Sequence, residues 1–109
     1  MADVLGAFEQ AVLLAVLRLG DDAYGRAILK EVQARLERDV AAGATHATLE
    51  RLVTKGLLAS RTGSGTPIRA GRARRYYRLQ PAAIRALNDA RAAVETIWHG
   101  HSWPLKGRA

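Results

Sequence analysis

The chain has 109 residues, which suits one domain of ordinary size or a small domain that completes its core by pairing. Apolar residues make up 49% and charged residues 25%, as in a globular protein. The absence of cysteine excludes disulfides and thiolate-bound zinc. The longest apolar run, residues 11–17, is too short to cross a bilayer and the first residues are not basic, so we expect a cytoplasmic protein.

The net charge of +7 is concentrated in one third of the chain. Residues 1–50 carry a net charge of −3, residues 51–88 hold nine basic and no acidic side chains, and residues 89–109 carry +1. Because a solvated surface normally mixes both signs, this concentration predicts a polyanionic partner. The basic segment has no apolar face to insert into lipid, which favours nucleic acid over a membrane.

The first half of the chain predicts two helices. Apolar residues at helical spacing indicate a helix over residues 5–19 whose apolar stripe covers most of its circumference, and a dimer is the simplest way to bury it. The Gly20-Asp21-Asp22 stretch is expected to end this helix and to cap the next one, over residues 23–35. Within that second helix, Gly25 is expected to let another helix approach closely.

The second half predicts a helix, a hairpin and a last helix. The third helix spans residues 42–54 and ends at Lys55-Gly56, with the glycine in the left-handed conformation. Strands over residues 57–61 and 73–79 flank a glycine-rich loop, and in the second strand Tyr77 and Leu79 are expected to face the core. Pro81 is well placed to begin the last helix.

This order of elements predicts a mainly α (α+β) fold, a winged helix-turn-helix with a two-stranded wing. We expect a DNA-binding domain over residues 1–80, a C-terminal dimerisation helix over residues 81–100 and a flexible tail over residues 101–109. In such a fold the second helix of the helix-turn-helix pair, here the third of the chain, enters the major groove, and the wing lies along the DNA backbone.

Three stretches, DDAYGRAILKEV, GATHATLERLVTKGLL and TPIRAGRARRYYRLQPAAIRAL, resemble the PadR-like transcriptional regulators in order and spacing. With FEQAVLLAVLRLG, the likeness covers residues 5–98. It implies a homodimeric winged-helix repressor of the bacterial cytoplasm, of the short type with a single C-terminal helix. The chain departs from the family at Ala41, where a capping serine is common, and at Thr45 and His46, where a large apolar residue and a tyrosine are usual. Thr45 is therefore expected to weaken the packing beneath the third helix.

The candidate DNA contacts form two groups. Small residues at the start of the third helix permit a close approach to base edges, while arginine holds phosphate oxygens through its planar fork. Glu50 can accept a hydrogen bond from a cytosine amino group, or face solvent beside Arg51. The recognition-helix candidates are Ala42, Gly43, His46, Ala47, Glu50 and Arg51, and the wing and backbone candidates are Lys55, Arg69, Arg72 and Arg74.

The last helix carries a seam at nearly heptad spacing, and an exposed seam of this kind predicts a twofold homodimer. The expected interface residues are Leu13, Leu17, Ile84, Leu87, Arg91, Val94 and Trp98. Arg91 would then need a carboxylate or carbonyl partner, for example across the twofold axis. The resemblance implies that Trp98 could line a cavity for a small aromatic effector, and the alternative is a packing anchor.

An enzyme is not expected. The three histidines are accompanied by no cysteine and no paired carboxylates, and the GSG of residues 63–65 lacks the lysine and helix of a phosphate-binding loop. We predict no catalytic residue, metal site or cofactor. The sequence thus indicates a sequence-specific regulator of double-stranded DNA, a homodimeric repressor of a palindromic operator that a small ligand could release. The alternative is a winged-helix RNA-binding or protein-interaction adaptor without operator specificity.

Overall fold

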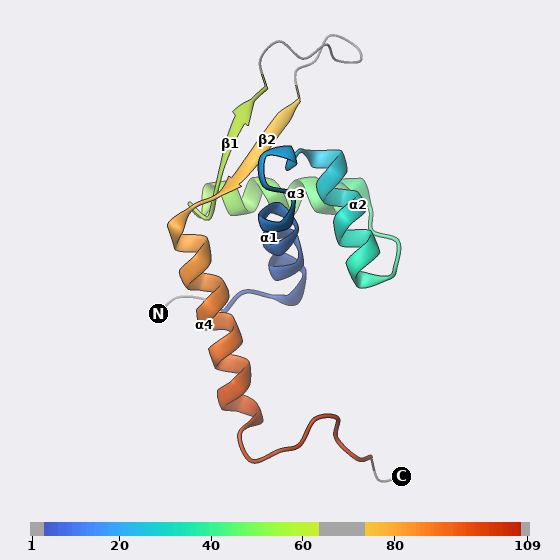
Figure 1. Ribbon diagram of the computed structural model, residues 1–109, viewed down its shortest axis with the longest axis vertical. Coiled ribbons are helices and arrows are strands. Elements are labelled where there is room, and N and C mark those ends of the chain that lie inside the picture. Colours follow the sequence, from blue (N-terminus) through green and yellow to red (C-terminus); the bar gives the residue numbers. More distant parts are fainter. Residues whose placement is uncertain (1–3, 64–73, 108–109) are drawn as a thin grey trace.

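The computed structural model describes residues 4–63 and 74–107. Its elements are α1 (Ala7–Leu19), a short 3-10 helix (Gly20–Asp22), α2 (Gly25–Leu36), α3 (Ala42–Thr54), β1 (Leu58–Thr62), β2 (Arg75–Leu79) and α4 (Pro81–Trp98) (Figure 1). This order confirms the mainly α, winged helix-turn-helix fold. Most of the predicted glycine-rich loop lies outside the described residues. Within the described part of the chain, no helix is long and apolar enough to span a bilayer.

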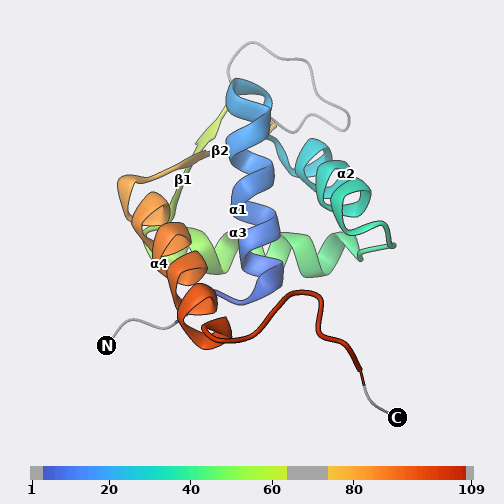
Figure 2. The same ribbon diagram turned by 60° about the horizontal axis from the view of Figure 1, so that its bottom comes forward.

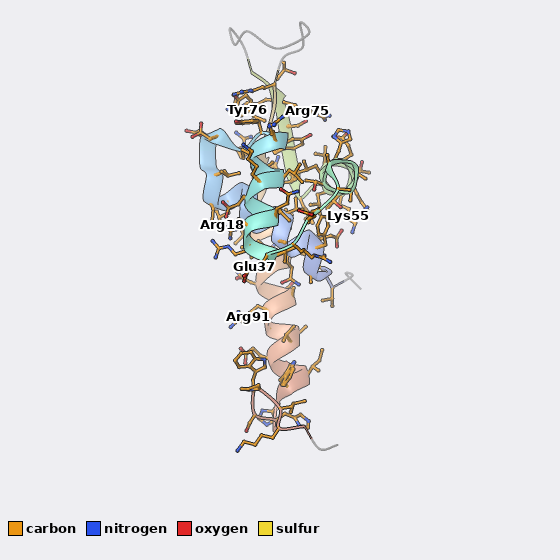
Figure 3. The ribbon with its side chains drawn as sticks, turned by 90° about the vertical axis from the view of Figure 1, so that its right-hand side faces the viewer. Arg18, Glu37, Lys55, Arg75, Tyr76 and Arg91 are labelled. Atoms are coloured by element: carbon orange, nitrogen blue, oxygen red, sulfur yellow. The ribbon has the colours of Figure 1, made fainter. Side chains whose placement is uncertain are left out.

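Helix α1 lies at the centre of the domain, between α2 and α4, and α3 crosses it (Figure 2). The core forms where their apolar faces meet, with Val12, Ile28 and Leu52 fully buried. Ala83 and Ala90 join the first half of α4 to the same cluster. The second half of α4 extends beyond the other helices (Figures 1 and 3).

Strands β1 and β2 form an antiparallel hairpin whose register runs from Leu58 opposite Leu79 to Thr62 opposite Arg75. The hairpin is also attached to the residues before α2, because the Tyr77 N–H donates to the Ala23 carbonyl at 2.8 Å and Tyr24 bridges to Tyr76. Tyr77 is buried and Leu79 packs against the core, as predicted. The base of the wing is therefore fixed to the start of α2.

This attachment explains two wrong predictions about α2. Residues 23 and 24 are extended along β2, so α2 begins only at Gly25, and Tyr24 occupies the capping position without a side-chain hydrogen bond. Asp21 and Asp22 belong to the 3-10 helix and do not cap α2.

The prediction for Gly25 is also wrong. Nothing lies within 4 Å of the point where a β-carbon on Gly25 would be, so this glycine does not serve a close helix contact.

Helix α3 has the bounds that the sequence predicted. Its first turn lacks a side-chain cap, because Ala41 stands at the capping position. Gly56, just beyond its C-terminal end, has φ of 79° and supplies the expected left-handed turn. Thr45 is buried, and its hydroxyl donates to the Ala41 carbonyl at 3.4 Å. The threonine therefore places no unpaired hydroxyl beneath the helix.

Candidate nucleic-acid interface

The leading half of α3 offers small side chains to solvent. Ala42, Gly43, His46 and Ala47 are all exposed, whereas Leu49 and Leu52 of the same helix are buried. These leucines pack into the core cluster, so the opposite face of α3 points into solvent. Small side chains also leave the helix backbone open to the edges of bases.

Two arginine side chains stack on a pair of tyrosine rings where the wing meets the residues before α2. The Arg74 guanidinium carbon lies 4.2 Å from the centre of the Tyr24 ring, and that of Arg61 lies 4.7 Å from the centre of the Tyr76 ring. The two rings meet edge to face at 5.7 Å. Stacking orients a guanidinium group by its face and leaves its N–H edges available for phosphate oxygens. Arg69 and Arg72, the other predicted wing contacts, lie outside the described residues.

The two basic residues at the end of α3 are paired with a carboxylate of α1. Glu9 Oε2 accepts from Lys55 Nζ at 3.1 Å and lies 3.5 Å from Arg51 Nε. The Glu9 side chain is only 14% exposed, whereas those of Arg51 and Lys55 are 50% and 40% exposed. Both cations therefore link α3 to α1 and keep part of their surface for a phosphate.

Glu50 does not merely face solvent beside Arg51. Its Oε2 atom accepts a hydrogen bond from Arg75 Nη1 at 2.8 Å and lies 3.4 Å from the Tyr77 hydroxyl. The contacts join α3 to β2, the second strand of the wing. Arg75 and Tyr76 lie at the wing end of the molecule (Figure 3).

The predicted interface residues fall into two environments. Leu17, Ile84 and Val94 are 53%, 43% and 45% exposed, and Leu87 and Trp98 are half-buried. Leu13, in contrast, is fully buried in the core of its own protomer, so its predicted role in pairing is wrong. Leu13 belongs to the same buried apolar cluster as Ile28 of α2 and Leu52 of α3.

The end of α4 carries the remaining two candidates. Arg91 is 3.6 Å from Glu95 of the same helix, so a carboxylate partner is available without a second chain. Trp98 lines an open cavity of about 650 Å³ with Arg91, Trp103 and neighbouring residues. Its wall combines these two tryptophans with charged and polar side chains, including Glu95.

Residues 13–89 match the transcriptional regulator PadR-like family. The chain belongs to this family. Its members are transcription regulators that bind DNA, not enzymes. This confirms the resemblance on which the sequence interpretation drew.

Solved structures of other regulators have the same fold. A transcriptional regulator from Clostridium thermocellum aligns with a TM-score of 0.69 at 20% identity, over 88% of this chain and 93% of that one. A PadR family regulator from Eggerthella lenta gives 0.64 at 27% identity, over 83% and 75%. BpsR of Bordetella bronchiseptica, whose DNA binding is regulated by 6-hydroxynicotinic acid, gives 0.66 at 19% identity, over 97% and 72%. A comparison with curated proteins gave no match.

For this PadR-like chain, the sequence interpretation missed four residues of the candidate interface. Glu9 and Arg75 were not assigned as partners of the basic and acidic side chains on α3, and Tyr24 and Arg61 were not assigned to the stack. The register of the hairpin, which places Arg61 opposite Tyr76, would have revealed the last of these. No comparable signal exists for Glu9, because Lys55 is 46 residues away in the sequence.

The pairing of Glu9 predicts a pH-dependent stability. Burial alone would raise the pKa of this carboxyl, but hydrogen bonds from Lys55, the Gly6 N–H and Arg51, together with the positive charge of Lys55, lower it below the ordinary value of 4.5. A lowered pKa stabilises the fold above the pKa of the unfolded chain, and this contribution is lost as the pH falls through the folded-state pKa. We expect Glu9→Gln to be less stable by about 1 kcal/mol at pH 7 and to approach the parent protein near pH 3.

Urea unfolding of both proteins at pH 7 and pH 3 measures this effect. Glu37→Gln, at an exposed carboxylate after α2, is the control and should leave the stability nearly unchanged at both values. A stability difference between Glu9→Gln and the parent that stays constant with pH would show that the carboxylate charge is not involved.

Proposed function

We propose that this PadR-like regulator is a homodimeric repressor that acts in the cytoplasm on a palindromic operator in double-stranded DNA. Residues 1–80 would bind DNA and residues 81–100 would pair the two protomers. The proposal is carried by the exposed apolar side chains on α1 and α4, Leu17, Ile84, Val94 and Ile97. An apolar row of this kind on a protruding helix favours burial against a second copy, and a twofold pair of recognition helices calls for a symmetric operator.

Each protomer would place α3 in a major groove, with half-sites about 34 Å apart or a multiple of that. In this arrangement Ala42, Gly43 and Ala47 allow a close approach, and His46 reads base edges. Lys55 and Arg51 would hold phosphates with the surface that Glu9 leaves exposed. Arg74, with Arg69 and Arg72 of the wing, would hold the flanking backbone.

A small aromatic effector that binds in the cavity beside Trp98 would release the protein from its operator. The size of the cavity and its two tryptophans support this, and its wall also carries the Arg91–Glu95 pair, whose atoms lie 3.6 Å apart. Such a ligand would shift the angle of α4 and so the distance between the two recognition helices. The packing-anchor interpretation of Trp98 predicts instead that Trp98→Ala destabilises the dimer without affecting any response to aromatic compounds.

Selection of genomic DNA fragments by the purified protein tests the proposal. We expect one motif with twofold symmetry and half-sites separated by whole helical turns, and lower transcription from a template that carries it. An asymmetric footprint, or preferential capture of RNA, would support the adaptor alternative. Higher transcription from this template would show that the protein is an activator and would contradict the repressor part of the proposal.

A further inference from the structure

Three elements meet at the carboxylate of Glu50. It lies on α3 and accepts from Arg75 Nη1 at 2.8 Å, and Arg75 is the first residue of β2. The other terminal nitrogen of Arg75 donates to Ser60 Oγ of β1 at 2.9 Å. A single guanidinium group therefore joins the recognition helix to both strands of the wing.

Tyr77 is the fourth side chain of this cluster, beside Glu50, Arg75 and Ser60. Its ring is buried, and the Arg75 guanidinium carbon lies 5.6 Å from the ring centre. Burial, together with the negative charge of Glu50, raises the pKa of the Tyr77 hydroxyl despite the opposing charge of Arg75. The phenol therefore keeps its proton and can donate to the carboxylate, and Arg75 has contacts on three sides.

The place of Glu50 on α3 indicates what its contact with Arg75 does. A bare carboxylate on a recognition helix would repel DNA phosphates, and Arg75 compensates its charge. Arg75 and Tyr77 both contact Oε2, which holds the carboxylate in place and leaves only Oε1 for a hydrogen bond from a cytosine amino group. In addition, Arg75 directly follows Arg74, so whatever fixes Arg75 also fixes where a candidate phosphate contact leaves the sheet.

We propose that Glu50 is a positioning residue: through Arg75 it sets the angle of the wing relative to the recognition helix, and it does not read a base. The hairpin is attached to the extended residues just before α2 by the bond from Tyr77 N–H to the Ala23 carbonyl. The Glu50–Arg75 pair provides a charged side-chain attachment on the α3 side, and we call this pair the latch. The proposal rests on the proposed function only for its effect on DNA, because the geometry of the wing can be measured without any DNA.

The wing angle can be measured by spin labelling, because the chain contains no cysteine to interfere. Labels at Ala47→Cys on α3 and Thr62→Cys at the end of β1, both exposed positions, report the distance between helix and wing. We expect a narrow distribution in the parent background and a broader one with Glu50→Ala or Arg75→Ala, and no further broadening with both. Exchanging the charges, as Glu50→Arg with Arg75→Glu, should narrow it again. An unchanged distribution in both single variants would overturn the proposal.

DNA binding provides a second, independent measurement. By charge alone, Glu50→Ala should strengthen DNA binding and Arg75→Ala should weaken it. The latch predicts instead that both weaken binding, each by roughly threefold on every sequence, and that the double variant is no worse than either. A changed preference at a single operator position in Glu50→Ala alone would show that Glu50 reads a base.

Asp39→Ala is the matched control, because it removes the same charge from an exposed site just before α3. It should bind DNA as tightly as the parent protein or more tightly, and leave the label distances unchanged. Because Glu50 and Arg75 are 40% and 44% exposed, their alanine variants should remain folded, which thermal unfolding will verify. If no operator exists, the label distances still decide between a latch and a free wing.

Discussion

Replacing Arg72 and Arg74 by alanine is expected to weaken binding to every duplex, specific or not, by roughly tenfold or more at 0.15 M salt. Phosphate contacts carry no base information, so the loss should be uniform across sequences. Each lost contact should also reduce the slope of log K against log salt concentration by about 0.9. For Arg74 the structure adds a reason, because its guanidinium group is already oriented by the Tyr24 ring at 4.2 Å.

Titrations of a labelled duplex at several salt concentrations measure both quantities. The control is Arg85→Ala with Lys106→Ala, which removes the same charge from exposed positions on α4 and the tail. The ring can be tested separately, since Tyr24→Phe keeps the stacking surface and Tyr24→Leu removes it. An unchanged slope in the Arg72/Arg74 variant would exclude the wing from the DNA interface.

The helices were predictable where their limits are set by their own residues. Helix α3 has the predicted bounds because its buried threonines and leucines recur at helical spacing and Gly56 provides the left-handed turn that ends it. The start of α2 was not predictable in this way. Tyr24 is held in an extended conformation by a strand more than fifty residues later, at Tyr76, and this tertiary pairing overrides the local capping signal of Asp21 and Asp22.

The residue types of the candidate site were predictable from the sequence, but the contacts between their side chains were not. The exposed face of α3 follows from the helical period, and the excess of arginine follows from counting. The partners of Arg51, Lys55 and Glu50 do not follow, because Glu9 and Arg75 reach them only after the chain has folded. Leu13 shows the same limit for apolar residues: a stripe around most of α1 does not say which part faces the protomer's own core.

Introducing a charge at Leu17 or Val94 is expected to separate the proposed dimer into folded monomers. Both side chains are about half exposed in the protomer, so Leu17→Glu and Val94→Glu leave the core intact but bury a carboxylate against the partner. Because two linked half-sites gain affinity from their high effective concentration, the monomer should bind the operator about 10²- to 10⁴-fold more weakly. The loss should be much smaller for an isolated half-site, which engages only one protomer in either protein.

Sedimentation equilibrium and operator titration together measure this expectation, and Ala34→Glu on the exposed face of α2 is the control. The control variant should remain a dimer with unchanged affinity. If both interface variants still sediment as dimers, the protomers pair through another surface and the apolar row on α4 must be explained differently. If they become monomers yet keep full operator affinity, then a single protomer recognises the whole site, and the palindrome is no longer required.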